Sequence, residues 1–154
     1  MAVKPIPDGY TSVTPYLIVK GADRALDYYK MAFGADELMR FDGPDGKIMH
    51  AELQIGNARL MLADEMPDHK SPETLGGSGS GLMLYVTDVD QTFERAVAGG
   101  GKSMKPVENQ FYGDRSGSLI DPFGHVWTIA THVEDVAEDE MKRRMDAASR
   151  AHAG

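Results

Sequence analysis

The chain has 154 residues, of which 42% are hydrophobic and 26% charged, as in one soluble globular domain or two small modules that share a core. A formal net charge of -8 disfavours binding to nucleic acid or to an anionic membrane surface, because both are themselves negatively charged. Cysteine is absent, which excludes disulfides, thiolate nucleophiles and zinc–thiolate sites. Residues 1–10 contain no apolar run, and no stretch approaches the roughly 20 apolar residues that span a bilayer, so we expect a cytoplasmic protein.

Similar residues recur along the chain at one fixed interval. Val19 pairs in this way with Val86, and Gly46 pairs with Gly113. A constant interval, with the same order of predicted elements in both halves, indicates two modules of equal length.

The first module is expected over residues 10–66. It begins with a β-rich run at 14–19, followed by apolar residues at helical spacing over 22–33. Gly34 suits the left-handed position that ends a helix. Three further strands are predicted, at 37–41, 48–55 and 58–63, and the last two form a hairpin around Gly56-Asn57.

A connector from Asp64 to Ser80, with the linker proper at 67–80, separates the modules and is expected to be flexible. Its length would allow the modules to pack within one chain or across two. The second module, expected over 81–132, begins with a strand at 82–86 and continues with a helix capped by Asp88. Its remaining predicted strands are 105–110, 116–120 and 126–131. Residues 133–154 should form an appended helix and a tail.

Several short motifs carry a resemblance to a known family. Residues 26–30 with 33–35 resemble its first helix, Tyr112-Gly113-Asp114-Arg115 its aromatic-Gly-x-Arg segment, and 121–125 its Asp-Pro-x-Gly turn. Over Tyr10 to Val133 the sequence resembles the vicinal oxygen chelate superfamily, which includes glyoxalase I, extradiol dioxygenases, fosfomycin-resistance enzymes and bleomycin-binding proteins. Residues 49–52 and 61–65 resemble its PhnB-like branch. The resemblance implies an α+β fold of two βαβββ modules with cupped mixed sheets, extended here by a C-terminal helix, and a homodimer.

The resemblance also predicts where a metal ion would be held. In the metalloenzymes of the superfamily, each module supplies one ligand from its first strand and one from its last. These positions fall on Thr14, Met61, Gly81 and Thr128, and none offers the imidazole or carboxylate that such ions require. We therefore expect no metal and no other cofactor.

Alternation along the strands predicts which side chains line the cup. His50 and Glu52 lie on the polar face of the strand at 48–55, where they could orient a ligand or exchange protons with it. They are the candidate catalytic residues, although such a pair could equally be a structural strand face. Arg115 could recognise a polar group, but an arginine in such a turn more often pairs internally. The full predicted ligand-binding set is Thr14, Tyr16, His50, Glu52, Met61, Met83, Tyr85, Tyr112, Arg115 and Thr128.

These features predict a metal-independent protein that binds a small aromatic or amphipathic molecule. The alternative is a metal-dependent lyase, isomerase or dioxygenase whose ligands have moved, with His50 and Glu52 among them. A scaffold without a ligand is a third interpretation, and the sequence leaves open whether any reaction is catalysed.

Overall fold

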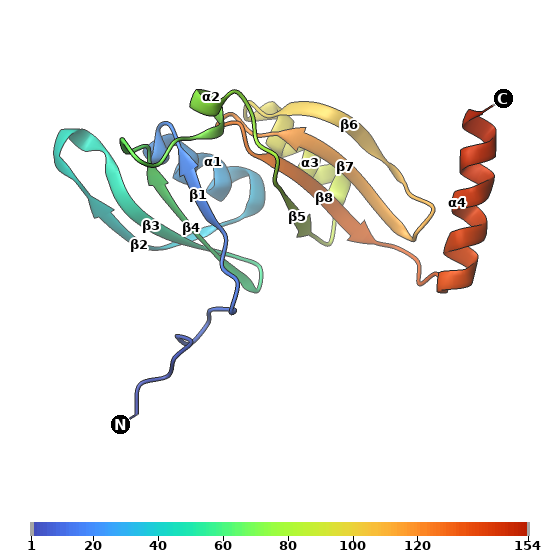
Figure 1. Cartoon of the computed structure of the whole chain (residues 1–154), viewed down its shortest axis with the longest axis horizontal. Coiled ribbons are helices and arrows are strands. Elements are labelled where there is room, and N and C mark those ends of the chain that lie inside the picture. The colour runs from blue at the N-terminus through green and yellow to red at the C-terminus, as the bar shows by residue number, and fades with distance from the viewer. Residues whose placement is uncertain (1, 154) are drawn as a thin grey trace.

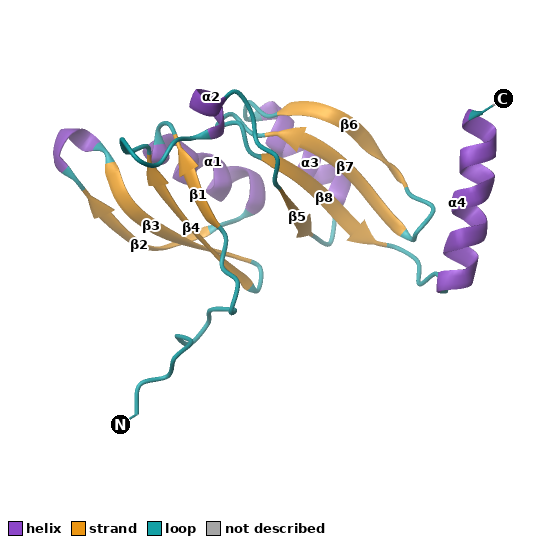
Figure 2. Cartoon of the chain, in the orientation of Figure 1, coloured by secondary structure: helices purple, strands orange, loops and turns teal. Residues whose placement is uncertain are grey.

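The computed structural model describes residues 2–153 and contains two four-stranded mixed sheets, with strand orders β1-β4-β3-β2 and β5-β8-β7-β6. Figure 1 shows the sheets side by side, and Figure 2 shows a helix packed against each of them. The first module consists of β1 (Tyr16–Val19), α1 (Ala22–Phe33), β2 (Asp36–Asp42), the 3₁₀ turn η1 (Pro44–Gly46), β3 (Ile48–Ile55) and β4 (Ala58–Asp64). The expected α+β fold is confirmed.

The second module repeats the order of the first. A short helix α2 (Pro72–Leu75) precedes β5 (Gly81–Tyr85), α3 (Val89–Ala98), β6 (Lys102–Asn109), β7 (Asp114–Ile120) and β8 (Val126–His132). Helix α4 (Glu138–His152) follows as the expected appended helix. Helix α2 lies inside the segment that the sequence indicated as a flexible connector. Composition missed it because the helix has only four residues, and the buried Ser71 before it is held by two hydrogen bonds to Glu65 rather than by a run of helix formers.

The two modules share the way in which their first helix begins. The Asp64 carboxylate, at the end of β4, accepts a hydrogen bond of 2.8 Å from the backbone N–H of Ala22. At the equivalent place in the second module, the Thr131 hydroxyl accepts one of 3.0 Å from the N–H of Val89. Each last strand therefore satisfies an N–H at the start of the helix, which otherwise has no partner within the helix.

A buried carboxylate joins the two modules. Asp121, in the Asp-Pro-x-Gly turn, accepts hydrogen bonds from the Tyr29 hydroxyl of α1 and, at 2.9 Å, from the Trp127 indole. The backbone N–H groups of Phe123 and His125 donate to its other oxygen, both at 2.9 Å. Burial and the adjacent Asp121 carboxylate raise the pKa of Tyr29 well above its ordinary value. The turn therefore links the two modules through Tyr29, in addition to connecting β7 to β8.

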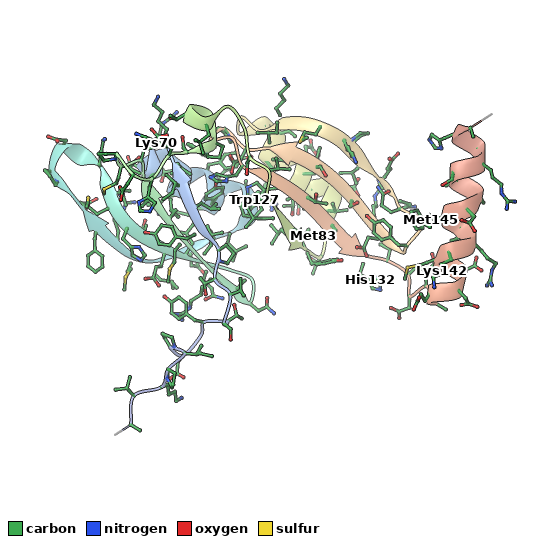
Figure 3. All side chains as sticks on the ribbon, viewed as in Figure 1. Lys70, Met83, Trp127, His132, Lys142 and Met145 are labelled. Carbon is green, nitrogen blue, oxygen red and sulfur yellow. The ribbon has the colours of Figure 1, made fainter. Side chains whose placement is uncertain are left out.

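Trp127 packs against a helix, as the sequence pattern indicated. Its ring centroid lies 5.5 Å from that of Tyr29 and 4.6 Å from that of Phe33, both on α1. Figure 3 shows Trp127 between the two sheets, with Met83 and His132 farther along the second. The core therefore runs continuously from one module into the other, with side chains from both.

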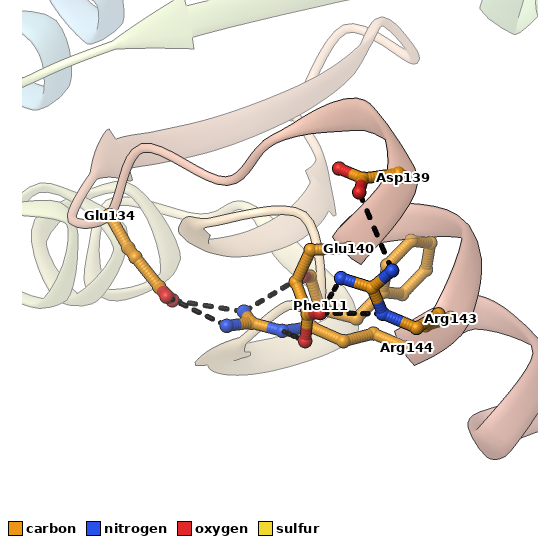
Figure 4. Close-up of polar contacts among 6 residues, drawn as sticks. All are labelled: Phe111, Glu134, Asp139, Glu140, Arg143 and Arg144. Atoms are coloured by element: carbon orange, nitrogen blue, oxygen red, sulfur yellow. Dashed lines mark hydrogen bonds and ion pairs between the residues drawn. The ribbon is translucent and has the colours of Figure 1, made fainter.

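Helix α4 stands apart from the sheets and buries none of its residues (Figure 1). Arg144 holds it in place, because its guanidinium donates to both carboxylate oxygens of Glu134, at 2.8 and 3.0 Å, and to the backbone carbonyl of Phe111 at 3.2 Å (Figure 4). Glu140 on the same helix also accepts from Arg144. Within residues 2–153, no helix is long and apolar enough to cross a bilayer.

Candidate functional site

Each sheet has one face covered by helices and one face that we call the open face. On β3, Ala51 and Leu53 are buried in the core, whereas His50 and Gln54 alternate with them and are only partly buried. This is the arrangement that a period of two predicts for a half-covered strand. The polar residues singled out on this strand therefore lie on the open face.

Three of the predicted ligand-binding residues form a hydrogen-bonded chain on the open face of the first sheet. The Tyr16 hydroxyl lies 2.8 Å from Nδ1 of His50, and Nε2 of His50 lies 2.9 Å from Oε2 of Glu52. We call this arrangement the Tyr16–His50–Glu52 chain. The imidazole is fixed at both nitrogens, so its orientation is set by its two neighbours.

Glu52 is buried but incompletely hydrogen-bonded. Only 6% of the residue is exposed, yet its Oε1 atom has no hydrogen-bond partner in the described part of the chain. The buried carboxylate of Asp64 differs, because it accepts three backbone N–H bonds of 2.8–2.9 Å, from Gly21, Ala22 and Ile48. A buried polar atom without a partner is uncommon and costs stability, so Oε1 of Glu52 calls for an explanation.

The Tyr16–His50–Glu52 chain borders several cavities, among them one lined by Tyr16 and one lined by Glu52. One, of about 510 Å³, is bounded by β1, β3 and β4 and by the start of the connector, with Tyr16, Ile18, Met49 and Met66 among its lining residues. The other, of about 380 Å³, lies between the sheet and residues 5–12. Thr14, Glu52 and Met61 line this second cavity, so two of the positions predicted from the family's metal site line the same cavity as Glu52.

The open face of the second sheet brings together other predicted residues. Met83 lies opposite Thr128 across the β5–β8 pair. The Thr128 hydroxyl is 2.9 Å from that of Ser118, so the two groups satisfy each other. Gly81 stands at the start of β5, opposite Val126.

A second hydrogen-bonded chain runs along the end of this sheet. The Tyr85 hydroxyl donates to Asp114 at 2.8 Å, and Asp114 is also 2.8 Å from Nδ1 of His132. Nε2 of His132 lies 2.7 Å from Asp135. Hydrogen bonds to Asp135 and Asp114 raise the pKa of His132, and the bond to Asp114 raises the pKa of Tyr85.

Sequence reasoning named Tyr85 but missed its partners Asp114 and His132. The signal was present in the last hairpin. Once Ile120 is placed opposite Val126, strict antiparallel pairing places Asp114 opposite His132, as the structure shows. The turn at 121–125 therefore fixes a contact at the far end of both strands.

Arg115 and Tyr112 do not join these clusters. Arg115 donates twice to the Asp90 carboxylate at the start of α3, at 2.8 Å in each bond, and also contacts Asn109. This ion pair lowers the pKa of Asp90. Tyr112 lies in the preceding turn, edge-on to Phe111. The arginine is thus engaged within the protein, and a ligand contact at either residue stays a prediction.

Among residues 2–153, no three His, Asp or Glu side chains are grouped so that they could hold a metal ion. The structure thus provides no alternative ligand cluster to the four positions Thr14, Met61, Gly81 and Thr128. That the protein binds no metal and no other cofactor stays a prediction.

Comparison with known proteins defines the class to which this fold belongs. The profile of the Glyoxalase/Bleomycin resistance protein/Dioxygenase superfamily matches residues 10–129, and the chain belongs to that family. An uncharacterized protein of Mycobacterium bovis is 40% identical over 141 residues, covering 88% of this chain and 93% of its own. A Mycobacterium tuberculosis protein is equally similar over 83% of its length.

Solved structures show the same fold. TioX from Micromonospora sp. ML1 superposes with a TM-score of 0.62 at 25% identity, over 82% of this chain and 100% of TioX. Protein PA1353 from Pseudomonas aeruginosa gives 0.63 at 26% identity, over 80% and 99%. The fosfomycin resistance protein FosX of Listeria monocytogenes gives 0.62 at 17% identity, over 85% and 97%, a likeness of fold alone. The resemblance found in the sequence is confirmed at the level of the superfamily.

Proposed function

We propose that this protein binds a small aromatic or amphipathic organic molecule on the open face of its first sheet, without a metal ion, and acts as a homodimer. The observation that carries the proposal is the Tyr16–His50–Glu52 chain between two largely apolar cavities. A few polar groups set in apolar and aromatic surroundings are typical of sites for small organic ligands. Membership of a superfamily that includes bleomycin resistance proteins agrees with a binding role.

The proposal that no metal is bound rests on the side chains at the four positions where the family's metalloenzymes carry their ligands. A threonine hydroxyl is a poor neutral ligand, a methionine thioether is too soft for most divalent ions of this kind, and glycine has no side chain. His50 uses both ring nitrogens within the protein, which leaves none free for an ion in this arrangement. These features favour a binder over the metal-dependent alternative.

The proposed dimer follows from the apolar surface that one chain leaves exposed. Tyr16, Phe41, Met83 and Tyr85 are all large and exposed on the open faces. The four-stranded sheets also end in unpaired edges. A second copy that covers these faces would remove apolar surface from water and would enclose the ligand site. Light scattering coupled to size-exclusion chromatography measures the oligomeric state directly.

A thermal-shift screen with a broad panel of aromatic and amphipathic compounds tests the proposed binding. A ligand present at about a hundredfold its dissociation constant adds about 2.7 kcal/mol to the free energy of unfolding, which raises the melting temperature by several degrees. Tyr16→Ala should lose this shift. Lys142→Ala, on the exposed surface of α4, is the matched control and should keep it.

Elemental analysis of protein purified without a metal-affinity tag separates the two functions. A stoichiometric divalent ion that is lost in His50→Ala would establish the metal-dependent alternative instead. A panel that produces no shift would remove the support for a binding function.

A further inference from the structure

We propose that the ligand is an organic cation, specifically an amphipathic amine, whose ammonium group donates a hydrogen bond to the free Oε1 of Glu52. The inference rests on the proposed binding function and adds the chemical class of the ligand. Three independent features of the site lead to it: the number of donors around Glu52, the direction of the hydrogen bonds, and the distribution of charge.

The first feature is the shortage of donors around one buried carboxylate. Asp64 accepts three backbone N–H bonds, and Asp121 accepts four bonds from two side chains and two N–H groups. Asp114 accepts one bond on each of its oxygens. Glu52 accepts from His50 alone, and its Oε1 is buried without a partner. Since a buried carboxylate needs donors on both oxygens, one donor that Glu52 requires is missing from the described chain.

The second feature is the direction of the Tyr16–His50–Glu52 chain. With a neutral imidazole, the Tyr16 hydroxyl donates to Nδ1, and Nε2–H donates to the Glu52 carboxylate. The chain therefore ends on an acceptor, and the atom left over at its end is also an acceptor. A ligand group that completes this arrangement must donate, which a protonated amine does and a carboxylate or phosphate does not.

The third feature is the charge around the site. The cavity that Glu52 lines has no lysine or arginine of the described chain among its lining residues, so no such protein cation balances the carboxylate from that side. The nearby Arg59 is already engaged, because it bonds Gln54 and stacks on the ring of Tyr10 at 4.5 Å. A cation that enters this cavity would meet the Glu52 carboxylate, which attracts positive charge.

The apolar lining specifies the rest of the ligand. Ile18, Met49 and Met66 surround one cavity, and Ile6 and Met61 contribute to the other. Methionine adapts to irregular shapes, which suits a hydrophobic body of variable outline. A small hydrophilic cation would leave this surface without a partner, so the amine is expected to be amphipathic.

The test uses matched compounds that differ only in the polar group. Each set joins one hydrophobic body (phenylbutyl, naphthylethyl or indolylethyl) to an amine, an alcohol or a carboxylic acid, and binding is measured by isothermal titration calorimetry at pH 7. The wild-type protein should bind the amine about tenfold to a hundredfold more tightly than the alcohol, as expected for a charge-assisted hydrogen bond. The acid should bind most weakly.

Two variants assign the preference to Glu52. Glu52→Gln keeps the shape of the side chain but removes its charge, so it should lose the amine preference and keep the alcohol affinity. Glu94→Gln makes the same change on the exposed surface of α3 and should leave all three affinities unchanged. The melting temperature of each variant shows whether it is folded.

The outcomes separate this inference from the function on which it rests. If amine, alcohol and acid bind equally to the wild-type protein, the ligand class is overturned while the binding function stands. If Glu52→Gln keeps the amine preference, the assignment to Glu52 is overturned. If none of the compounds binds, both the binding function and its ligand class lose their support.

Discussion

The open faces of the two modules differ at positions that the fold makes equivalent. Glu52 lies opposite Met61 in the first sheet, and Ser118 lies opposite Thr128 in the second. Ser118 and Thr128 satisfy each other's hydroxyl groups, whereas Glu52 keeps a buried oxygen without a partner. In both modules the last strand accepts a hydrogen bond from the start of the helix, whereas the polar groups of the open faces differ. This contrast is the reason why the proposed ligand site lies in the first module.

A second contrast separates the acids that hold the fold together from the acid that remains available. Asp64 and Asp121 are fully hydrogen-bonded by helix starts, aromatic side chains and turn N–H groups. Glu52 stabilises no element in this way. If this division between structural and available acids is correct, replacing Asp121 or Asp64 should destabilise the protein far more than replacing Glu52.

Replacing Asp121 with alanine should have the largest effect on stability. The change leaves the Tyr29 hydroxyl, the Trp127 indole and two backbone N–H groups without their acceptor at the junction of the modules. We expect a loss of about 3–5 kcal/mol, as when one partner of a buried charged network is removed. Urea denaturation measures it. A loss below about 1 kcal/mol would show that the turn does not join the modules energetically.

The contrast between Asp64 and Glu52 can be tested with a matched pair of amide substitutions. Asp64→Asn should cost about 1–3 kcal/mol, because the amide cannot replace both acceptor oxygens of the carboxylate. Glu52→Gln should change the free energy of unfolding by less than about 0.5 kcal/mol, since its Oε1 has no donor to lose. Chemical denaturation of both variants decides the point. Equal losses would contradict the division proposed above.

His132 should make the stability of the second module depend on pH near neutrality. Hydrogen bonds to Asp135 and Asp114 raise its pKa above 6.5, so the folded state holds the proton more tightly than the unfolded chain. The resulting stabilisation is fully present below about pH 6.5 and is lost as the pH rises through the raised pKa. Denaturation of the wild-type protein and of His132→Gln between pH 5 and 9 measures this. The stability difference between them should shrink with rising pH, and a constant or growing difference contradicts the assignment.

Arg144→Ala should have the smallest effect on the stability of the whole molecule, but it should clearly weaken the attachment of helix α4. The guanidinium joins α4 to Glu134 and to the carbonyl of Phe111, but no residue of α4 is buried. The melting temperature should stay nearly constant, because exposed ion pairs contribute little. Amide hydrogen exchange within 138–152 should become faster. Lys142→Ala is the control and should change neither quantity appreciably, because within residues 2–153 its amine pairs with Glu138 of the same helix.

Much of the fold could be predicted from periodicity and turn chemistry. The helix at 22–33 ends at Gly34, whose φ of 67° is the left-handed conformation that glycine favours, and Asp88 caps the next helix by accepting from the N–H of Gln91. Strand alternation correctly placed His50 on the open face. These features depend on residues near one another in the sequence, so the sequence by itself determined them. It also determined that Thr14, Met61, Gly81 and Thr128 carry no imidazole or carboxylate.

Only the tertiary structure decided which of these residues meet. Tyr16 and His50 come from different strands, and Asp114 reaches His132 only through the register of the last hairpin. Asp121 joins the modules because α1 packs against the turn, and Oε1 of Glu52 stays without a partner because no donor among residues 2–153 reaches it. The period of a strand fixes which face a side chain occupies. Its partners depend on long-range register and packing, which local sequence patterns do not encode.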